Sequence, residues 1–170
     1  GNNEVIDYPA YFTPEIVVCG SIDDGYQRAE GSGHGQSLDI VAPGENILST
    51  LPNNTVGYAS GTSMAAPHVS GIAALMIAAN PNLTRETVVR IIEQTARKIS
   101  PNGAYTYYQY QNRYHGDMNV EVGYGLVDAA KAVAVANDAG VYPPNSSPRL
   151  DYYIMTGAAA QYDDWFVMGN

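Results

Sequence analysis

The longest apolar stretch of the chain lies near its centre, over residues 63–79. A helix drawn through this stretch carries apolar side chains on nearly every face: Val69, Ile72, Ala73, Leu75, Met76 and Ile77. A helix that is apolar all round is typical of a protein interior, for example beneath a parallel sheet. The pattern therefore predicts a buried central helix, which ends at Asn80-Pro81.

Three short apolar runs before this helix predict strands. They cover residues 15–22, 38–42 and 46–50. Residues 15–22 have the continuous apolar pattern of a buried strand, and residues 46–50 are expected to form a short third strand. Residues 52–54 (Pro-Asn-Asn) indicate a turn, and residues 55–58 are expected to lead from it into the central helix.

Two further helices are expected after the central one. Thr84 is a suitable N-cap for a helix over residues 84–98, and a small-residue helix is predicted over 126–137. The apolar stripe of the first of these consists of Val88, Val89, Ile91, Ile92, Thr95 and Ile99. Its predicted solvated face carries Arg85, Glu86, Arg90, Glu93 and Arg97, with i,i+4 pairs of opposite charge at Glu86–Arg90 and Glu93–Arg97.

Composition bounds the kind of protein. A chain of 170 residues with 45% hydrophobic content can form one domain with its own core. Its 17 acidic and 8 basic residues give a net charge of -9, which argues against nucleic-acid binding. No apolar run reaches the length of a membrane span, so none is expected. Cys19, the one cysteine, cannot form an internal disulfide and fits a small buried hydrophobe.

Two segments outside this pattern are harder to interpret. Residues 100–122 are rich in tyrosine, and their partial alternation makes a β-hairpin plausible. An insertion packed on the body of the domain is favoured over an aromatic surface for a carbohydrate or a partner. Residues 141–170 are read as a linker and a short extension, which either adds strands to the body or begins a further domain.

Ser63 is the leading candidate for chemistry. It lies in the run Gly-Thr-Ser-Met-Ala-Ala-Pro-His, residues 61–68, at the start of the central helix. The free N–H groups and the positive dipole end of a helix stabilise negative charge that develops beside such a serine. The alternative is an N-capping serine on a core helix.

These eight residues resemble the serine motif of the subtilisin-like serine proteases, the subtilases. Further segments that resemble the family are residues 16–23, 38–44, 47–52, 58–61 and 123–129. The resemblance implies an α/β fold: part of a subtilisin-like parallel-sheet sandwich with a buried central helix. Residues 1–140 would form the C-terminal half of the catalytic domain, with its N-terminal half missing.

The resemblance implies a serine endopeptidase that forms an acyl-enzyme on Ser63 and acts on polypeptide substrates. Asn2, or its neighbour Asn3, would donate to the oxyanion. The family's Asp and His motifs should precede the serine, and neither occurs in residues 1–62. His34, His68 and His115 are poor substitutes for the base, so the isolated chain is expected to be inactive.

The resemblance also suggests one cation site. Asp39 occupies the position of an aspartate that holds a calcium or monovalent cation in many subtilases, with help from backbone carbonyls such as those of Ala10 and Phe12. Ser37 stands where the family has a companion glutamate, which weakens the site. The alternative is that Asp39 is a hydrogen-bonded loop carboxylate. No cofactor is expected to be required.

Two readings without catalysis remain open. The chain could be a half-protease or pseudoenzyme that acts as a protein-interaction module, or a fragment without a function of its own. Expected partners are the missing N-terminal half or a second copy, bound through an open sheet. A secreted, periplasmic or cell-surface location is implied by the resemblance alone.

Overall fold

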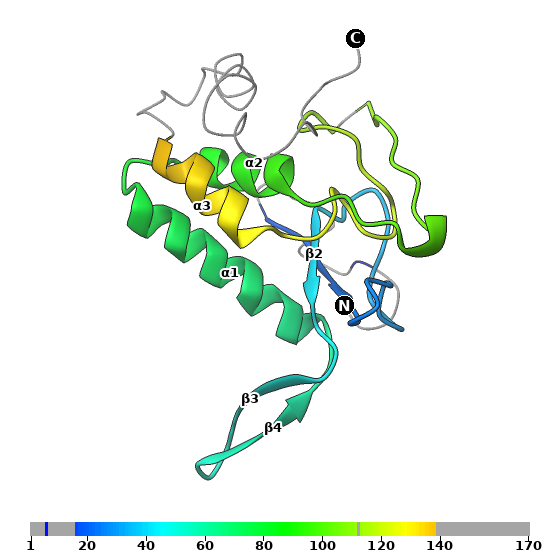
Figure 1. Cartoon of the computed structure of the whole chain (residues 1–170), viewed down its shortest axis with the longest axis vertical. Helices are drawn as coiled ribbons and strands as arrows, with labels where there is room; N and C mark the ends of the chain where they lie inside the picture. Colours follow the sequence, from blue (N-terminus) through cyan, green and yellow to red (C-terminus); the bar gives the residue numbers. More distant parts are fainter. Residues whose placement is uncertain (1–5, 7–15, 112, 139–170) are drawn as a thin grey trace.

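The computed structural model describes residue 6 and residues 16–111 and 113–138. Its elements are β1 (Cys19–Ile22), β2 (Ile40–Pro43), β3 (Ile47–Leu51), β4 (Thr55–Ala59), α1 (Thr62–Ala79), α2 (Arg85–Thr95), the 3-10 turn η1 (Pro101–Gly103) and α3 (Ala129–Asp138). The three helices pack together beside the β1–β2 pair, while the β3–β4 hairpin projects from the body (Figure 1). Asn2, the carbonyls proposed at 10 and 12, and the extension at 141–170 lie outside the described residues.

The strands β1 and β2 form the parallel pair that the apolar runs predicted. Their register runs from Cys19 opposite Ile40 to Ile22 opposite Pro43. Ile40 belongs to the cluster that packs against the helices, whereas Val41 belongs to a second cluster with Leu126. Both faces of β2 are therefore buried, which explains why its sequence is continuously apolar.

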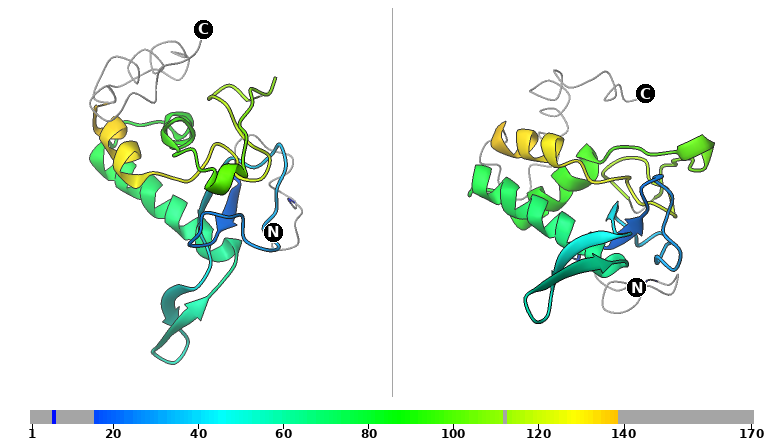
Figure 2. Two further views of the ribbon diagram at one scale, coloured as in Figure 1. Left: turned by 45° about the vertical axis from the view of Figure 1, so that its right-hand side comes forward. Right: turned by 60° about the horizontal axis from the view of Figure 1, so that its bottom comes forward.

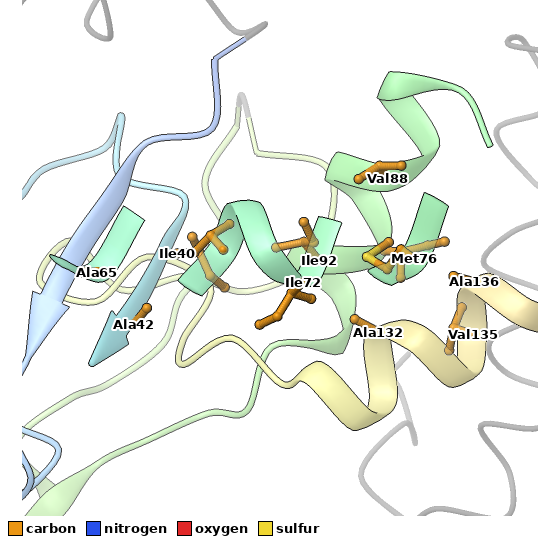
Figure 3. Close-up of a cluster of buried hydrophobic side chains, with 12 residues drawn as sticks. Ile40, Ala42, Ala65, Ile72, Met76, Val88, Ile92, Ala132, Val135 and Ala136 are labelled. Atoms are coloured by element: carbon orange, nitrogen blue, oxygen red, sulfur yellow. The ribbon is translucent and has the colours of Figure 1, made fainter. Parts of the chain in front are cut away.

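The main core lies between this pair and the three helices (Figure 3). Its buried members are Ile40, Ala42, Ala65, Val69, Ile72, Met76, Val88, Ile91, Ile92, Ala132, Val135 and Ala136. Ala132 and Ala136 of α3 present small side chains to this core, while Met76 of α1 and Ile92 of α2 contribute large ones. Burying a large side chain of this kind contributes about 1.5–3 kcal/mol.

The central helix α1 is buried along one stripe only. Ala65, Val69, Ile72 and Met76 line that stripe, whereas Leu75 is 56% exposed and Ile77 is 48% exposed. The predicted burial on all sides is thus not seen in the described structure, because β1, β2, α2 and α3 cover one side of the helix. Among the described helices, α1 alone has the length and the mean hydropathy of 1.3 that would permit a membrane span, a property shared by core helices of soluble proteins.

The strands β3 and β4 form an antiparallel hairpin that projects from the body, as Figure 1 and the left view of Figure 2 show. The predicted strand over 46–50 corresponds to β3, but β4 was expected only as a lead-in to the helix. Asn53 and Asn54 turn the chain with φ of 63° and 56°. Asparagine tolerates this left-handed region better than most residues, so the predicted turn can close a hairpin.

The structure of α2 confirms the predicted N-cap but differs from the predicted solvated face. The Thr84 side chain accepts a hydrogen bond from the Thr87 N–H, as expected of an N-cap. Glu93, placed on the solvated face by its spacing, is only 5% exposed and pairs with His115. The segment that carries His115 lies over this part of the helix, so the prediction for Glu93 was wrong.

The tyrosine-rich segment packs on the body, as the favoured interpretation held. The Tyr105 hydroxyl accepts a hydrogen bond from the Arg28 N–H at 2.7 Å. The Tyr107 hydroxyl bonds both the N–H and the carbonyl of Ile99 at 3.0 Å. In the described part of this segment, the strand pairing consists of two isolated antiparallel bridges, Tyr108–Met118 and Asn119–Gly123.

Candidate active site

Ser63 is the second residue of α1 and lies at the surface. The helix starts after Gly61, whose φ of 142° is a conformation that L side chains rarely adopt. The first-turn N–H groups of a helix lack intrahelical acceptors and form the positive end of its dipole. Ser63 therefore combines an accessible hydroxyl with a local field that favours an oxyanion.

The end of β2 fixes the start of α1. The Gly61 N–H donates to the Gly44 carbonyl at 2.7 Å, so the turn after β2 is bonded to the residue that begins the helix. A Cβ on Gly44 would lie 2.7 Å from the Gly61 carbonyl oxygen and 2.2 Å from Ser21 Oγ. Only glycine fits there, and the sheet thereby positions Ser63 through backbone contacts.

The three histidines of the chain lie in three different surroundings. His68 Nδ1 lies 2.9 Å from the Met64 carbonyl, one turn back along α1. His34 lies in a glycine-rich loop, and its buried Nδ1 has no hydrogen-bond partner among the described residues. His115 pairs with Glu93. The structure thus brings none of them into a described contact with Ser63.

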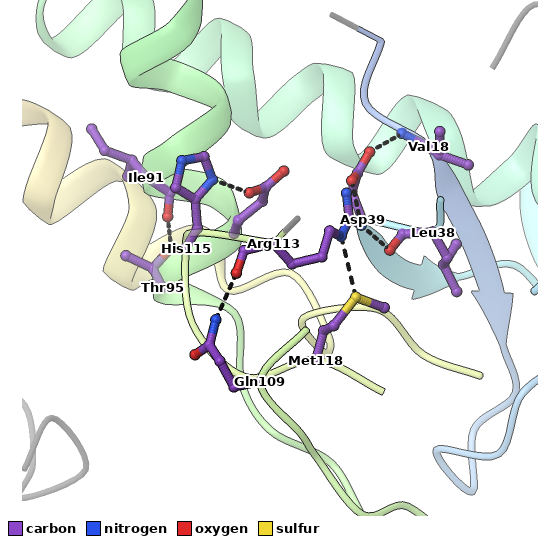
Figure 4. A network of polar contacts seen from close by, with 10 residues as sticks. Val18, Leu38, Asp39, Ile91, Thr95, Gln109, Arg113, His115 and Met118 are labelled. Atoms are coloured by element: carbon purple, nitrogen blue, oxygen red, sulfur yellow. Dashed lines mark hydrogen bonds and ion pairs between the residues drawn. The ribbon is translucent and has the colours of Figure 1, made fainter. Parts of the chain in front are cut away.

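Asp39 is buried just before β2, and both of its carboxylate oxygens have partners (Figure 4). Oδ2 accepts the Val18 N–H at 2.7 Å, and Oδ1 pairs with Arg113 Nη2 at 2.7 Å. Burial, followed by the negative charge of Glu93, raises the pKa of Asp39 to about 6, although Arg113 and the Val18 N–H act in the opposite direction.

The surroundings of Asp39 do not fit a metal ion. The guanidinium of Arg113 already contacts the carboxylate and also donates to the adjacent Leu38 carbonyl. Within the described residues, no group of three or more His, Cys, Asp or Glu side chains could hold a metal. Asp39 makes the contacts of the alternative interpretation, a hydrogen-bonded carboxylate.

Sequence reasoning missed the polar network around Asp39. It joins Asp39 to Arg113, and it brings Glu93 of α2 together with His115. The partners are far apart in the chain, and Arg113 and His115 lie in a segment without clear periodicity. The sequence positions of these acidic and basic residues do not reveal which of them pair. No residue spacing predicts where residues 107–118 lie on the fold.

Cys19 is unsuited to thiol chemistry. It packs against the main core at the start of β1. Burial raises the pKa of its thiol to about 12, so the reactive thiolate is scarce near neutral pH. The residue behaves as the small apolar side chain that the sequence predicted.

Comparison with known proteins identifies the family of this chain. A subtilisin of Bacillus pumilus is 41% identical over 105 residues, which cover 62% of this chain and 38% of the relative. The major intracellular serine protease of Bacillus subtilis (strain 168) is 51% identical over 73 residues, which cover 43% of this chain and 23% of the relative. The chain therefore spans less than two fifths of the length of either relative.

A solved structure, that of the prenylagaramide maturation protease PagA, superposes with a TM-score of 0.63 at 25% identity. The match covers 79% of this chain and 47% of that structure. The fold is thus shared with a protease over most of the chain. A family model described as the subtilase family matches residues 1–157, and the chain belongs to that family.

Proposed function

We propose that the protein containing this chain is a serine endopeptidase and that Ser63 is its nucleophile. The observation that carries the proposal is the placement of an exposed serine at the start of α1, held by the Gly44–Gly61 contact. Family membership supports the same reaction class. Polypeptides are the proposed substrates.

In the proposed reaction, Ser63 Oγ attacks the carbonyl carbon of the scissile peptide bond while a histidine takes the hydroxyl proton. The negative charge moves onto the carbonyl oxygen, where the Ser63 N–H and an asparagine side chain, proposed as Asn2, would bind it. The C–N bond then breaks as the imidazolium protonates the leaving amine. Water repeats the sequence and releases the acyl group from Ser63.

The base and the aspartate that orients it are proposed to come from a segment that precedes Gly1 in the full protein. The large unmatched share of the subtilisin relative supports this proposal, because the chain covers 38% of it. The isolated chain is accordingly proposed to be inactive, since no described histidine contacts Ser63.

Labelling with a fluorophosphonate probe tests the nucleophile. In the full protein, Ser63→Ala should abolish both labelling and peptide hydrolysis, because the attacking oxygen is removed. Ser70→Ala is a matched control: Ser70 is exposed on the same helix and bonds the Ala66 carbonyl at 3.2 Å. Labelling that persists in Ser63→Ala would contradict the assignment, and rapid labelling of Ser63 in the isolated chain would contradict its proposed inactivity.

The uncovered side of α1 is the proposed contact for the rest of the catalytic domain. Leu75 and Ile77 flank the buried stripe on its two sides and are 56% and 48% exposed, and exposed apolar surface of this kind is costly to leave in water. A second copy of the chain is the alternative occupant. Mixing the chain with a separately expressed N-terminal half should restore hydrolysis and give a 1:1 complex.

A non-catalytic interaction module is the second candidate, and the same exposed apolar side chains of α1 favour it. The two functions differ in one measurement. A module predicts that the full protein binds partners equally well with Ser63→Ala and that no fluorophosphonate labels it.

Secretion is proposed by resemblance to subtilisins, while the intracellular protease among the relatives represents the alternative. Separating the culture medium from the cells that produce the full protein distinguishes the two locations.

A further inference from the structure

One guanidinium group lies beside Asp39, where the sequence suggested a metal ion. Arg113 Nη2 pairs with Asp39 Oδ1 at 2.7 Å and also donates to the Leu38 carbonyl (Figure 4). A carboxylate oxygen and a backbone carbonyl are the oxygen donors that Ca²⁺ and similar cations use. In this chain, both donors are taken by one nitrogen atom.

Arg113 is held firmly in this position. Its Nε lies 3.2 Å from Met118 Sδ, and its Cζ lies 5.2 Å from the centre of the Tyr124 ring. Its backbone N–H donates to the Tyr110 carbonyl at 3.1 Å, and its carbonyl accepts from Gln109 Nε2 at 2.7 Å. The side chain is 19% exposed. The positive group is therefore fixed by the surrounding fold and largely removed from water.

A metal ion and this guanidinium cannot share the site. Both would need Asp39 Oδ1 as a ligand, and two cations a few ångströms apart repel strongly in a partly buried place. Ser37 supplies no second carboxylate. An entering metal would have to displace Arg113 from the carboxylate, the carbonyl and the aromatic face together.

The same segment also contacts a second buried carboxylate. His115, two residues beyond Arg113, pairs with Glu93, whose side chain is 6% exposed. Residues 107–118 thus bring two basic side chains onto two acidic groups of the body. These two contacts tie the described part of the segment to Asp39, just before β2, and to α2.

We propose that the Arg113 guanidinium replaces a structural metal ion in this protein, so that the region around Asp39 is stabilised by a covalently attached cation and needs no dissolved one. The role is structural and is separate from the proposed chemistry of Ser63. The stability of the fold at this site should therefore be the same in added calcium as in a chelator.

The first test compares the calcium response of the full protein with that of Asp39→Asn. Melting temperatures are measured in EDTA and in millimolar calcium chloride at about pH 8, where the carboxyl is ionised. We expect calcium to shift both proteins equally, because Asp39 holds no metal. A larger shift in the wild type than in Asp39→Asn would overturn the proposal.

The second test asks whether the charge of Arg113 matters. Arg113→Met should lower the melting temperature by about 6–12 °C, because it leaves a buried carboxylate unpaired. Arg113→Lys should retain more than half of that stability, and Asp39→Asn/Arg113→Met should melt above Arg113→Met because no bare charge remains. Losses that simply add in the double variant, or equal losses for Lys and Met, would show that Arg113 acts by packing and would overturn the proposal.

Discussion

Asp39 carries an ionisable group in a place that water barely reaches. Asp39 is 5% exposed. Burial together with the charge of Glu93 raises its pKa by more than the pairing with Arg113 lowers it. The folded protein consequently holds the Asp39 proton more tightly than the unfolded chain does. Asp39 is thus ionised at neutral pH at some cost to stability.

The stability of the fold should depend on pH through this group. Because the folded pKa of about 6 lies above the ordinary aspartate pKa of 3.8, the stabilising effect of the Asp39 proton is complete below about pH 4 and is lost as the pH rises through 6. Asp39→Asn cannot titrate. The free energy of unfolding of the wild type, relative to that variant, should therefore fall by roughly 2–3 kcal/mol across this window.

Urea unfolding of the two proteins at a series of pH values measures this difference. The comparison cancels the titration of other carboxyl groups, which both proteins share. A relative stability that rises with pH would mean that pairing with Arg113 outweighs burial at Asp39.

For single residues, the sequence was informative where a local rule applies. Ser63 stands at a helix start because glycine, small residues and an apolar run follow one another there. The burial of Glu93 could not be foreseen, since an i,i+4 pattern describes one helix in water and says nothing about a distant segment that covers it. The partner of Asp39 was hidden for the same reason.

The helix α2 shows how a single side chain defines the boundary of an element. Thr84 accepts the Thr87 N–H at 3.2 Å and thereby satisfies one of the donors that a helix start leaves open. Glu86 lies in the first turn, where its charge complements the helix dipole. The start of α2 is therefore stabilised by polar contacts as well as by its apolar stripe.

Thr84→Ala should destabilise the protein by about 1 kcal/mol, because it removes the side-chain acceptor at the N-cap. Thr106→Ala is the control, since Thr106 is an exposed threonine outside the helices. Chemical denaturation of both variants measures the change. An effect of Thr84→Ala no larger than that of the control would show that the cap contributes little.

Elements with a strong period were predicted, and elements made by pairing were not. The strands β1 and β2 and all three α-helices arise from apolar runs or stripes that lie within single segments, whereas β3 is mostly exposed and pairs with β4. The strand β4 contains Gly57 and gains its conformation by pairing with β3. The alternating tyrosines suggested a hairpin, but Tyr105 and Tyr107 direct their hydroxyls to the body, so the segment follows those contacts.

For the molecule as a whole, the sequence predicted an α/β arrangement with a parallel sheet, and the structure and its relatives confirm it. It also predicted a helix enclosed on all sides. The described residues cover only one side of α1. The apolar pattern on its other sides therefore indicates a cover that this part of the chain does not provide.

The isolated chain should therefore self-associate through α1. Replacing Leu75 and Ile77 together by glutamine should shift it toward the monomer, because the apolar contact surface is removed. Val56→Gln on β4 is the matched control, since Val56 is 69% exposed on the projecting hairpin. Analytical ultracentrifugation measures the distribution. If the control variant dissociates instead, the hairpin and not α1 is the contact.

The hydrogen bond from Gly61 to Gly44 closes a detour of the chain. The backbone leaves the body at Gly44, runs out and back through β3 and β4, and returns beside the point it left. The length of this detour is thereby uncoupled from the location of the nucleophile, and loop closure costs grow only slowly with length. The tip at Asn53-Asn54 is consequently a place where natural variants can lengthen, or a foreign peptide can be grafted, without moving Ser63.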